Sequence, residues 1–250
     1  MIQMHLAKRV ARNDDWGMAI ALPVSSSLLS SRIDATVEAL LAGLELRHAE
    51  TEKHARRVAG LATLLTLAVD SDLAAEPGVR EGYLLHDIGK LGVPDAILLK
   101  PGPLHELEWR IVERHPCLGA ELTRRLGLPE RTREVVGGHH ERWDGRGYPA
   151  GLAGEEIPLP ARIFAVIDTF DAMTHDRPYR AASAPDVAFR EVERCNGTQF
   201  DPRVVEAFLG LAASGSLPGD ADAEGETELQ RVLEGSLRQT LRRHAPGRSS

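Results

Sequence analysis

The sequence predicts an all-helical fold for this chain of 250 residues. Leu, Ala, Arg and Glu, which favour helices, dominate the composition, whereas runs of β-branched residues are short. Apolar residues also recur at the spacing of an amphipathic helix along much of the chain. Because hydrophobic residues make up 42% of the chain and aromatic residues only 4%, the core should consist mainly of Leu, Ala and Val.

The helical pattern divides into separate segments. Helices are predicted from about 31 to 44, from about 49 to 69, up to 86–87, from about 105, around 118–122, from 161 to 174, from about 201 to 211 and from about 227 to 242. Gly and Pro indicate turns at 76–78 and 101–103. Residues 91–95 are predicted to be extended, and Trp109, Ile111 and Val112 should face the core.

Charge, cysteine content and hydropathy argue against several classes of protein. The net charge is −7 and no long basic block occurs, so we expect no surface for a nucleic-acid polymer. Cys117 and Cys195 form neither a metal-ligand pair nor a disulfide framework, which favours a reducing compartment. The longest apolar run, about 61–69, is too short to span a bilayer, and no signal peptide is visible. We therefore expect a cytoplasmic protein without a membrane segment.

The most informative stretch is Leu84–Lys90, in which two apolar residues lead into His86 and Asp87. These adjacent side chains can ligate two different ions, because the two oxygens of the Asp87 carboxylate can bridge. Lys90 follows three residues later and returns to nearly the same helix face, where it could contact an anion bound to the metals. A polar helix end with an unrelated lysine is the alternative for this stretch alone.

Further candidate metal ligands occur in separate helical segments. Glu50 and His54 are four residues apart and share a helix face, and Asp168 interrupts an apolar helix where an unpaired carboxylate would be costly. The complete candidate set is Glu50, His54, His86, Asp87, His115, His139, His140 and Asp168. Five imidazoles and three carboxylates exceed the needs of one ion, and they suit Fe or Mn better than a structural zinc. We assign no role to the other histidines, His5, His48, His105, His175 and His244.

Such a set of ligands indicates phosphoryl chemistry. Paired metal ions are the usual means of in-line attack at phosphorus. Lys90, Arg177 and Arg180 are then the expected contacts for substrate phosphate, with the arginines able to bind in a bidentate manner.

In this order, the motifs resemble those of the HD-GYP family, a branch of the HD phosphohydrolase superfamily. The matching segments are Glu50–Val58, His86–Lys90, His115, His139–His140, Arg146–Pro149, Asp168–Thr174 and Arg177–Arg180. The resemblance covers about residues 46–211. It implies an HD-type helical bundle that hydrolyses the bacterial second messenger cyclic di-GMP to the linear dinucleotide pGpG, and in some members on to GMP.

The resemblance also assigns roles to residues. It implies two or three Fe or Mn ions held by the candidate ligands, and Glu50 matches the extra carboxylate of members with a third ion. Asp87, Lys90 and Asp171 become the expected catalytic residues, with Asp171 beside a ligand or the attacking water. Lys90, Arg177, Arg180 and Tyr148 become the expected substrate contacts. The Gly147–Pro149 loop is one that the family also uses to contact diguanylate cyclase domains.

The predicted organisation is a short, partly helical N-terminal segment (1–45), a catalytic domain (46–211), and an acidic linker with a C-terminal amphipathic helix (212–250). Core packing or a homodimer contact is expected for that last helix. Two alternatives stay open for the function. One is a related phosphohydrolase acting on a cyclic GMP-AMP or linear dinucleotide, and the other is a catalytically silent module that binds cyclic di-GMP or docks a cyclase.

Overall fold

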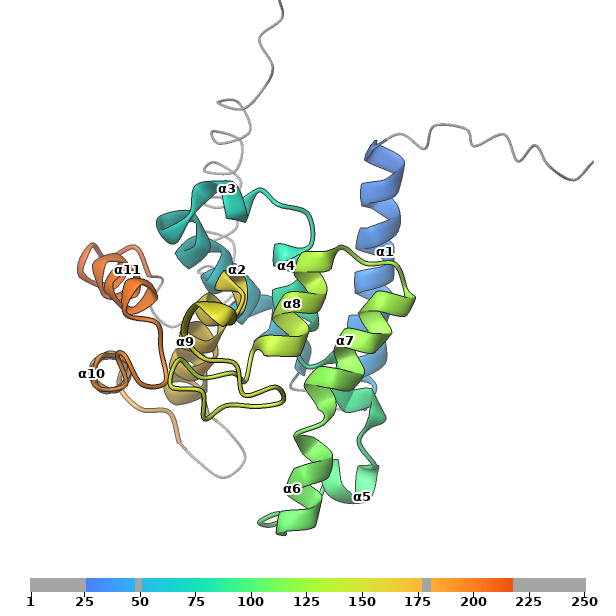
Figure 1. The fold of residues 1–250 in the computed structure, drawn as a ribbon. Coiled ribbons are helices and arrows are strands. Elements are labelled where there is room, and N and C mark those ends of the chain that lie inside the picture. Colours follow the sequence, from blue (N-terminus) through green and yellow to red (C-terminus); the bar gives the residue numbers. More distant parts are fainter. Residues whose placement is uncertain (1–25, 48–50, 177–180, 218–250) are drawn as a thin grey trace, which may run out of the picture.

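The computed structural model of the protein describes residues 26–47, 51–176 and 181–217. Its helices are α1 (Ser26–Glu45), α2 (Thr51–Val69), α3 (Ser71–Ala74), α4 (Val79–Leu85), the 3₁₀ turn η1 (Ile88–Gly92), α5 (Asp95–Leu98), α6 (Glu106–Val112), α7 (His115–Arg125), α8 (Glu130–Gly138), the 3₁₀ turn η2 (Gly154–Glu156), α9 (Leu159–Thr174), α10 (Pro185–Arg194) and α11 (Pro202–Ala213). Within these residues the strand-like pairing is limited to a bridge between Asn196 and Phe200. The predicted all-helical class is confirmed (Figure 1).

Helix α2 is the central element of the bundle, since it packs against α1, α4, α9 and α11. Its Val58, Leu61 and Leu65 are buried, as the helical spacing predicts. Helix α1 adds Val37 and Leu41 to the same core. A single hydrophobic core therefore fixes the relative positions of the helices that carry the candidate ligands.

The turn after Lys90 differs from the extended segment predicted for residues 91–95. Leu91 and Gly92 belong to the 3₁₀ turn η1, and the backbone is extended at Val93. The guanidinium of Arg47, just beyond α1, donates hydrogen bonds to the carbonyl oxygens of Leu91 (2.6 Å) and Val93 (3.0 Å). Tertiary hydrogen bonds from the turn after α1 thus hold a turn that the local sequence does not reveal.

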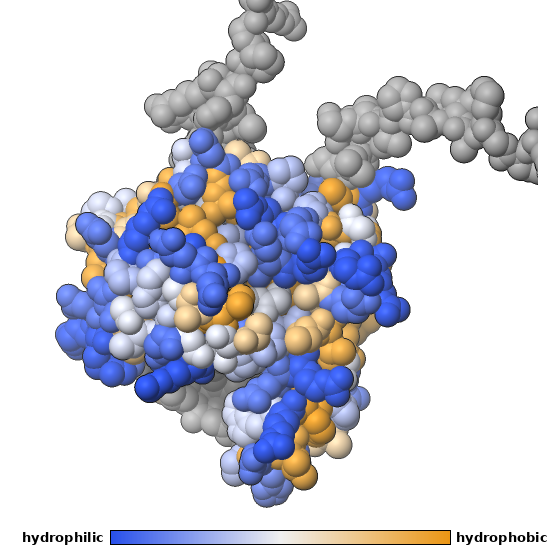
Figure 2. All heavy atoms as spheres, viewed as in Figure 1, coloured by the Kyte–Doolittle hydropathy of each residue, from blue (hydrophilic) through white to orange (hydrophobic). Residues whose placement is uncertain are grey.

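Helices α5 and α6 project from the body of the protein (Figure 1). Neither helix contains a buried residue. Trp109 and Ile111 are 50% and 37% exposed, so the prediction that they face the core is wrong. Figure 2 shows apolar and charged residues side by side on this projecting part. The helical period of an apolar stripe gives its direction but not whether anything packs against it.

The C-terminal part of the described bundle also differs in detail from the prediction. Helix α10 was not predicted, although its Ala188 and Val192 are buried. Helix α11 confirms the prediction for about 201–211, and Asp201 caps it by accepting from the Arg203 N–H. The helix predicted for 227–242 lies outside the described residues.

Candidate metal centre

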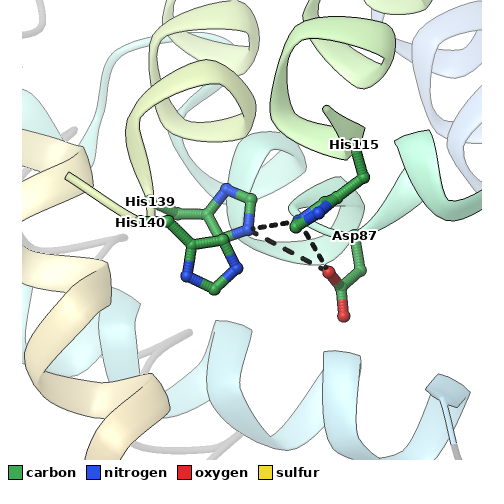
Figure 3. Close-up of side chains that lie close together, drawn as sticks. All are labelled: Asp87, His115, His139 and His140. Carbon is green, nitrogen blue, oxygen red and sulfur yellow. Dashed lines mark hydrogen bonds and ion pairs between the residues drawn. The ribbon is translucent and has the colours of Figure 1, made fainter. Parts of the chain in front are cut away.

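Two groups of candidate ligands face each other in the middle of the bundle. The Asp87 group consists of Asp87, His115, His139 and His140, and the Asp168 group consists of His54, His86 and Asp168. Within each group, one ligand atom from every residue lies within 4.8 Å of all the others. Figure 3 shows the side chains of the Asp87 group pointing towards one another. These residues come from α2, α7, α9 and the ends of α4 and α8, so packing of distant segments creates both groups.

The carboxylate of Asp87 lies between the two groups. Its Oδ1 is 3.3 Å from His115 Nε2 and 4.0 Å from His139 Nε2. Its Oδ2 is 3.3 Å from Nε2 of His86, which belongs to the other group. A carboxylate with one oxygen towards each group is suited to bridge two ions.

A glycine makes this arrangement possible. A Cβ atom at Gly89 would lie 2.6 Å from Gly119 N and would also collide with the carbonyl oxygen of His115. The backbone of η1 therefore rests directly on the first turn of α7, which no residue with a side chain would permit. This close approach brings Asp87 next to His115.

The hydrogen bonds of the histidines test whether a cation fits. Nδ1 of His86, His115 and His139 lies 3.0, 2.8 and 3.0 Å from a backbone carbonyl oxygen three residues earlier. A carbonyl only accepts, so each Nδ1 carries the proton and each Nε2 presents a lone pair, as metal-binding histidines do. Nε2 of His115 and Nε2 of His139 are 3.2 Å apart. Two lone pairs at this distance repel unless a cation lies between them, so the donor set fits a bound metal ion.

The pKa shifts of His139, His140 and Asp87 agree with this interpretation, whereas the shift of His86 has the opposite direction. Burial lowers the pKa of His139 well below its usual value and that of His140 to about 4, so both rings are neutral at neutral pH. Burial would raise the pKa of Asp87, but the charges of Lys90 and His86 outweigh it and hold the group ionised. Burial would lower the pKa of His86, but the neighbouring Asp87 carboxylate raises it. Neutral imidazoles and an ionised carboxylate are the forms that bind metal.

Lys90 lies at the edge of the Asp87 group. Its Nζ donates to Asp87 Oδ2 at 2.6 Å, and its side chain is partly exposed. The structure thus places this cation at the candidate centre, while its predicted contact with substrate phosphate stays a prediction.

Asp171 lies behind the Asp168 group and is 1% exposed. Its carboxylate accepts from Nε and Nη2 of Arg57 and lies 2.7 Å from Nδ1 of His54. Burial would raise its pKa, but the hydrogen bonds from His54 and Arg57 lower it. Asp171 therefore supports a candidate ligand, and its predicted role in catalysis stays a prediction.

Sequence reasoning missed Arg57 and His175. Nδ1 of His175 is 3.2 Å from Asp171 Oδ1, although no role was assigned to this histidine. The spacing carried a signal in both cases, since Arg57 follows His54 by three residues and His175 follows Asp171 by four. Helical neighbours of a candidate ligand were therefore the residues to examine.

The loop that follows His140 is held against the Asp87 group. Glu141 is 3% exposed and accepts the N–H groups of Ala150 (2.7 Å), Gly151 (3.2 Å) and Leu152 (3.1 Å). The Tyr148 ring stacks on the His140 ring with centroids 4.7 Å apart. Glu141, which sequence reasoning did not single out, is thus the residue that anchors this loop.

A pocket of about 250 Å³ opens beside the two groups. It is lined by His139, His140, Glu141, Arg142, Arg146, Gly147, Tyr148, Ala165, Asp168, Thr169 and Gln199. Tyr148, a predicted substrate contact, therefore faces a space next to the candidate metal ligands. The predicted residues Glu50, Arg177 and Arg180 lie outside the described residues.

Comparisons with known proteins identify relatives of this chain. A family model described as HD domain matches residues 38–204. The chain is 42% identical over 177 residues to a cyclic di-GMP phosphodiesterase of Thermotoga maritima (67% of this chain, 46% of that protein). It is 40% identical over 248 residues to a cyclic di-GMP phosphodiesterase of Pseudomonas aeruginosa (95% of this chain, 56% of that protein). It is also 42% identical over 161 residues to a 3'3'-cGAMP-specific phosphodiesterase of Vibrio cholerae (64% and 34%). The chain thus spans about half the length of the curated relatives it matches or less.

Solved structures agree on the fold. A cyclic GMP-AMP-specific phosphodiesterase of Vibrio cholerae superposes with a TM-score of 0.54 and 16% identity, over 75% of this chain and 53% of that one. An HD-GYP protein of Bdellovibrio bacteriovorus superposes with a TM-score of 0.51 and 15% identity, over 75% of this chain and 64% of that one. Among the described residues, no helix combines the length and apolarity that crossing a membrane requires. The family match over most of the chain and the shared motifs lead to one conclusion, that the chain belongs to the HD domain family, in its HD-GYP branch.

Proposed function

We propose that the chain is a metal-dependent phosphodiesterase that hydrolyses cyclic di-GMP to pGpG and on to GMP. The observation that carries the proposal is the position of Asp87, whose two oxygens face two separate groups of ligand atoms. The names of relatives at 36–42% identity support the choice of substrate. A cytoplasmic location agrees with the two free thiols, Cys117 and Cys195.

The two groups would each hold an ion of iron or manganese. Their donors are imidazole nitrogens and carboxylate oxygens without a thiolate, which is a donor set for these metals rather than for structural zinc. Glu50 would add a carboxylate for a third ion beside His54. When bound, such ions acidify water and stabilise the negative charge that develops on the phosphate.

The residues of the chain would contribute orientation and charge. The N–H groups at Nδ1 of His86, His115 and His139 donate to backbone carbonyls and keep each Nε2 free to bind. Lys90 would donate to a non-bridging phosphate oxygen from its position beside Asp87, with Arg177 and Arg180 as further contacts. Tyr148 would contact the nucleotide in the pocket, and Asp171 would hold His54. The Gly147–Pro149 loop would also be the site at which a diguanylate cyclase domain docks, and a homodimer would use the helix predicted for 227–242.

The test is metal content and turnover in protein purified without oxygen and supplied with Fe²⁺ or Mn²⁺. We expect at least two ions per chain and release of linear product from cyclic di-GMP. Asp87→Ala should lose ions from both groups together with activity, because one carboxylate serves both. Asp87→Asn, which preserves shape, controls for a simple packing defect. Wild-type protein that holds its metals but makes no linear product would favour the silent module, and an active Asp87→Ala would refute the bridging assignment.

A second candidate substrate is 3'3'-cGAMP. Three relatives at 37–42% identity are named as phosphodiesterases specific for this dinucleotide. Both substrates present the same phosphodiester linkages, so the metal groups alone do not separate them. The ratio of kcat/KM for cyclic di-GMP to that for 3'3'-cGAMP decides between the two.

A further inference from the structure

His54 is held differently from the other histidines whose Nδ1 has a hydrogen-bond partner on the backbone. Its neighbour in the Asp168 group, His86, donates Nδ1–H to the Tyr83 carbonyl oxygen at 3.0 Å. In the Asp87 group, His115 and His139 donate Nδ1–H to carbonyl oxygens of their own backbone turns. In the Asp168 group, Nδ1 of His54 instead meets Asp171 Oδ2, a side-chain atom from α9, at 2.7 Å. A carboxylate can rotate, whereas a helix carbonyl cannot, so His54 is only as well oriented as Asp171.

Arg57 is the residue that fixes Asp171. Its Nε donates to Oδ1 and its Nη2 to Oδ2 at 3.0 Å, which is the bidentate geometry that locks a carboxylate plane. Arg57 and His54 both belong to α2, one turn apart, so the ligand and the clamp share one rigid element. The guanidinium also compensates the charge of a carboxylate that is almost completely buried.

We propose that Arg57 is a positioning residue for the Asp168 group: through Asp171 it orients His54, and it thereby sets how tightly that group holds its ion. The inference rests on the proposed metal-dependent function. It implies an asymmetry between the groups, because His115 and His139 have no contact with this network among the described interactions. Loss of Arg57 should weaken the binding of the ion in the Asp168 group and leave the binding of the ion in the Asp87 group unchanged.

The experiment measures metal retention in Arg57→Gln, Asp171→Asn and Arg57→Lys. Each protein is loaded with Mn²⁺ without oxygen and desalted, and its metal content is determined by mass spectrometry. Arg57→Gln and Asp171→Asn should bind the Asp168-group ion about 10- to 100-fold more weakly and retain the Asp87-group ion. Arg57→Lys keeps the charge and should recover part of the affinity. Adding His86→Ala to Arg57→Gln should remove no further ion, whereas adding His115→Ala should.

Arg162→Gln is the matched control. Arg162 also makes a buried pair with an aspartate, Asp201, at 2.6 Å, but it does not contact either group. The Arg162→Gln protein should keep the wild-type metal content, although its melting temperature should fall by about as much as that of Arg57→Gln. The inference is overturned if Arg57→Gln retains both ions with wild-type affinity, or if it loses both ions in parallel as a general consequence of unfolding. Wild-type protein that binds no metal would refute the proposed function itself, so the two failures can be told apart.

Discussion

Gly89→Ala is a direct test of how the bundle builds the candidate centre. The added Cβ would lie 2.6 Å from Gly119 N, whereas ordinary contact begins at 3.4 Å, so this contact alone requires α7 to retreat from η1 by about 0.8 Å. The His115 carbonyl oxygen lies closer still to the added Cβ and requires a larger movement of the same part of α7. Overpacking against backbone of this kind costs about 3 kcal/mol. In a chain of this size the melting temperature should fall by roughly 6–12 °C.

The same movement should separate Asp87 from His115. At present Oδ1 of Asp87 lies 3.3 Å from Nε2 of His115. We therefore expect weaker metal binding as well as lower stability, measured by calorimetry and by metal content after desalting. Gly210→Ala is the matched control, because Gly210 lies in α11 with nothing within 4 Å of an added Cβ. It should raise stability by about 0.5–1 kcal/mol. A Gly89→Ala protein that melts with the wild type and keeps its metals would refute this account of the glycine.

Other expected outcomes concern pH, charge and the loop. Lowering the pH should release the ion of the Asp168 group first, because the pKa of His86 is raised and protons compete there at higher pH, whereas the pKa of His140 is lowered to about 4. Release of both ions in a single step on titration would contradict this order. Lys90→Ala should keep its metals and lose about 10- to 100-fold in kcat/KM, since a charge-assisted hydrogen bond to phosphate is lost; a metal-free variant would argue against the phosphate role. Glu141→Gln should destabilise the protein by about 2 kcal/mol and speed proteolysis within 142–153, because the buried acceptor of three N–H groups loses its charge. Unchanged resistance of this loop to protease would count against Glu141 as its anchor.

Much of the candidate centre could be predicted from the chemistry of the side chains and the order of the motifs in the sequence. His86 and Asp87 stood out because neighbouring imidazole and carboxylate groups at the end of an apolar helix need a partner. Asp168 and Asp171 stood out for the same reason in an apolar helix. Arg57 did not, because an arginine on a helix is common and its partner lies 114 residues away in the chain. The direction of a side chain towards a distant segment is not encoded in local spacing.

The sequence by itself determined the all-helical class, the helices with a regular apolar stripe, and the identity of the candidate ligands, because these depend on propensity, periodicity and donor chemistry within short segments. The tertiary structure decided how the ligands divide into two groups and which oxygen of Asp87 faces each group. It also decided that α6 remains exposed and that Arg57 supports His54 through Asp171. These features depend on which helix faces meet, and that is settled by packing of the whole core rather than by any one segment.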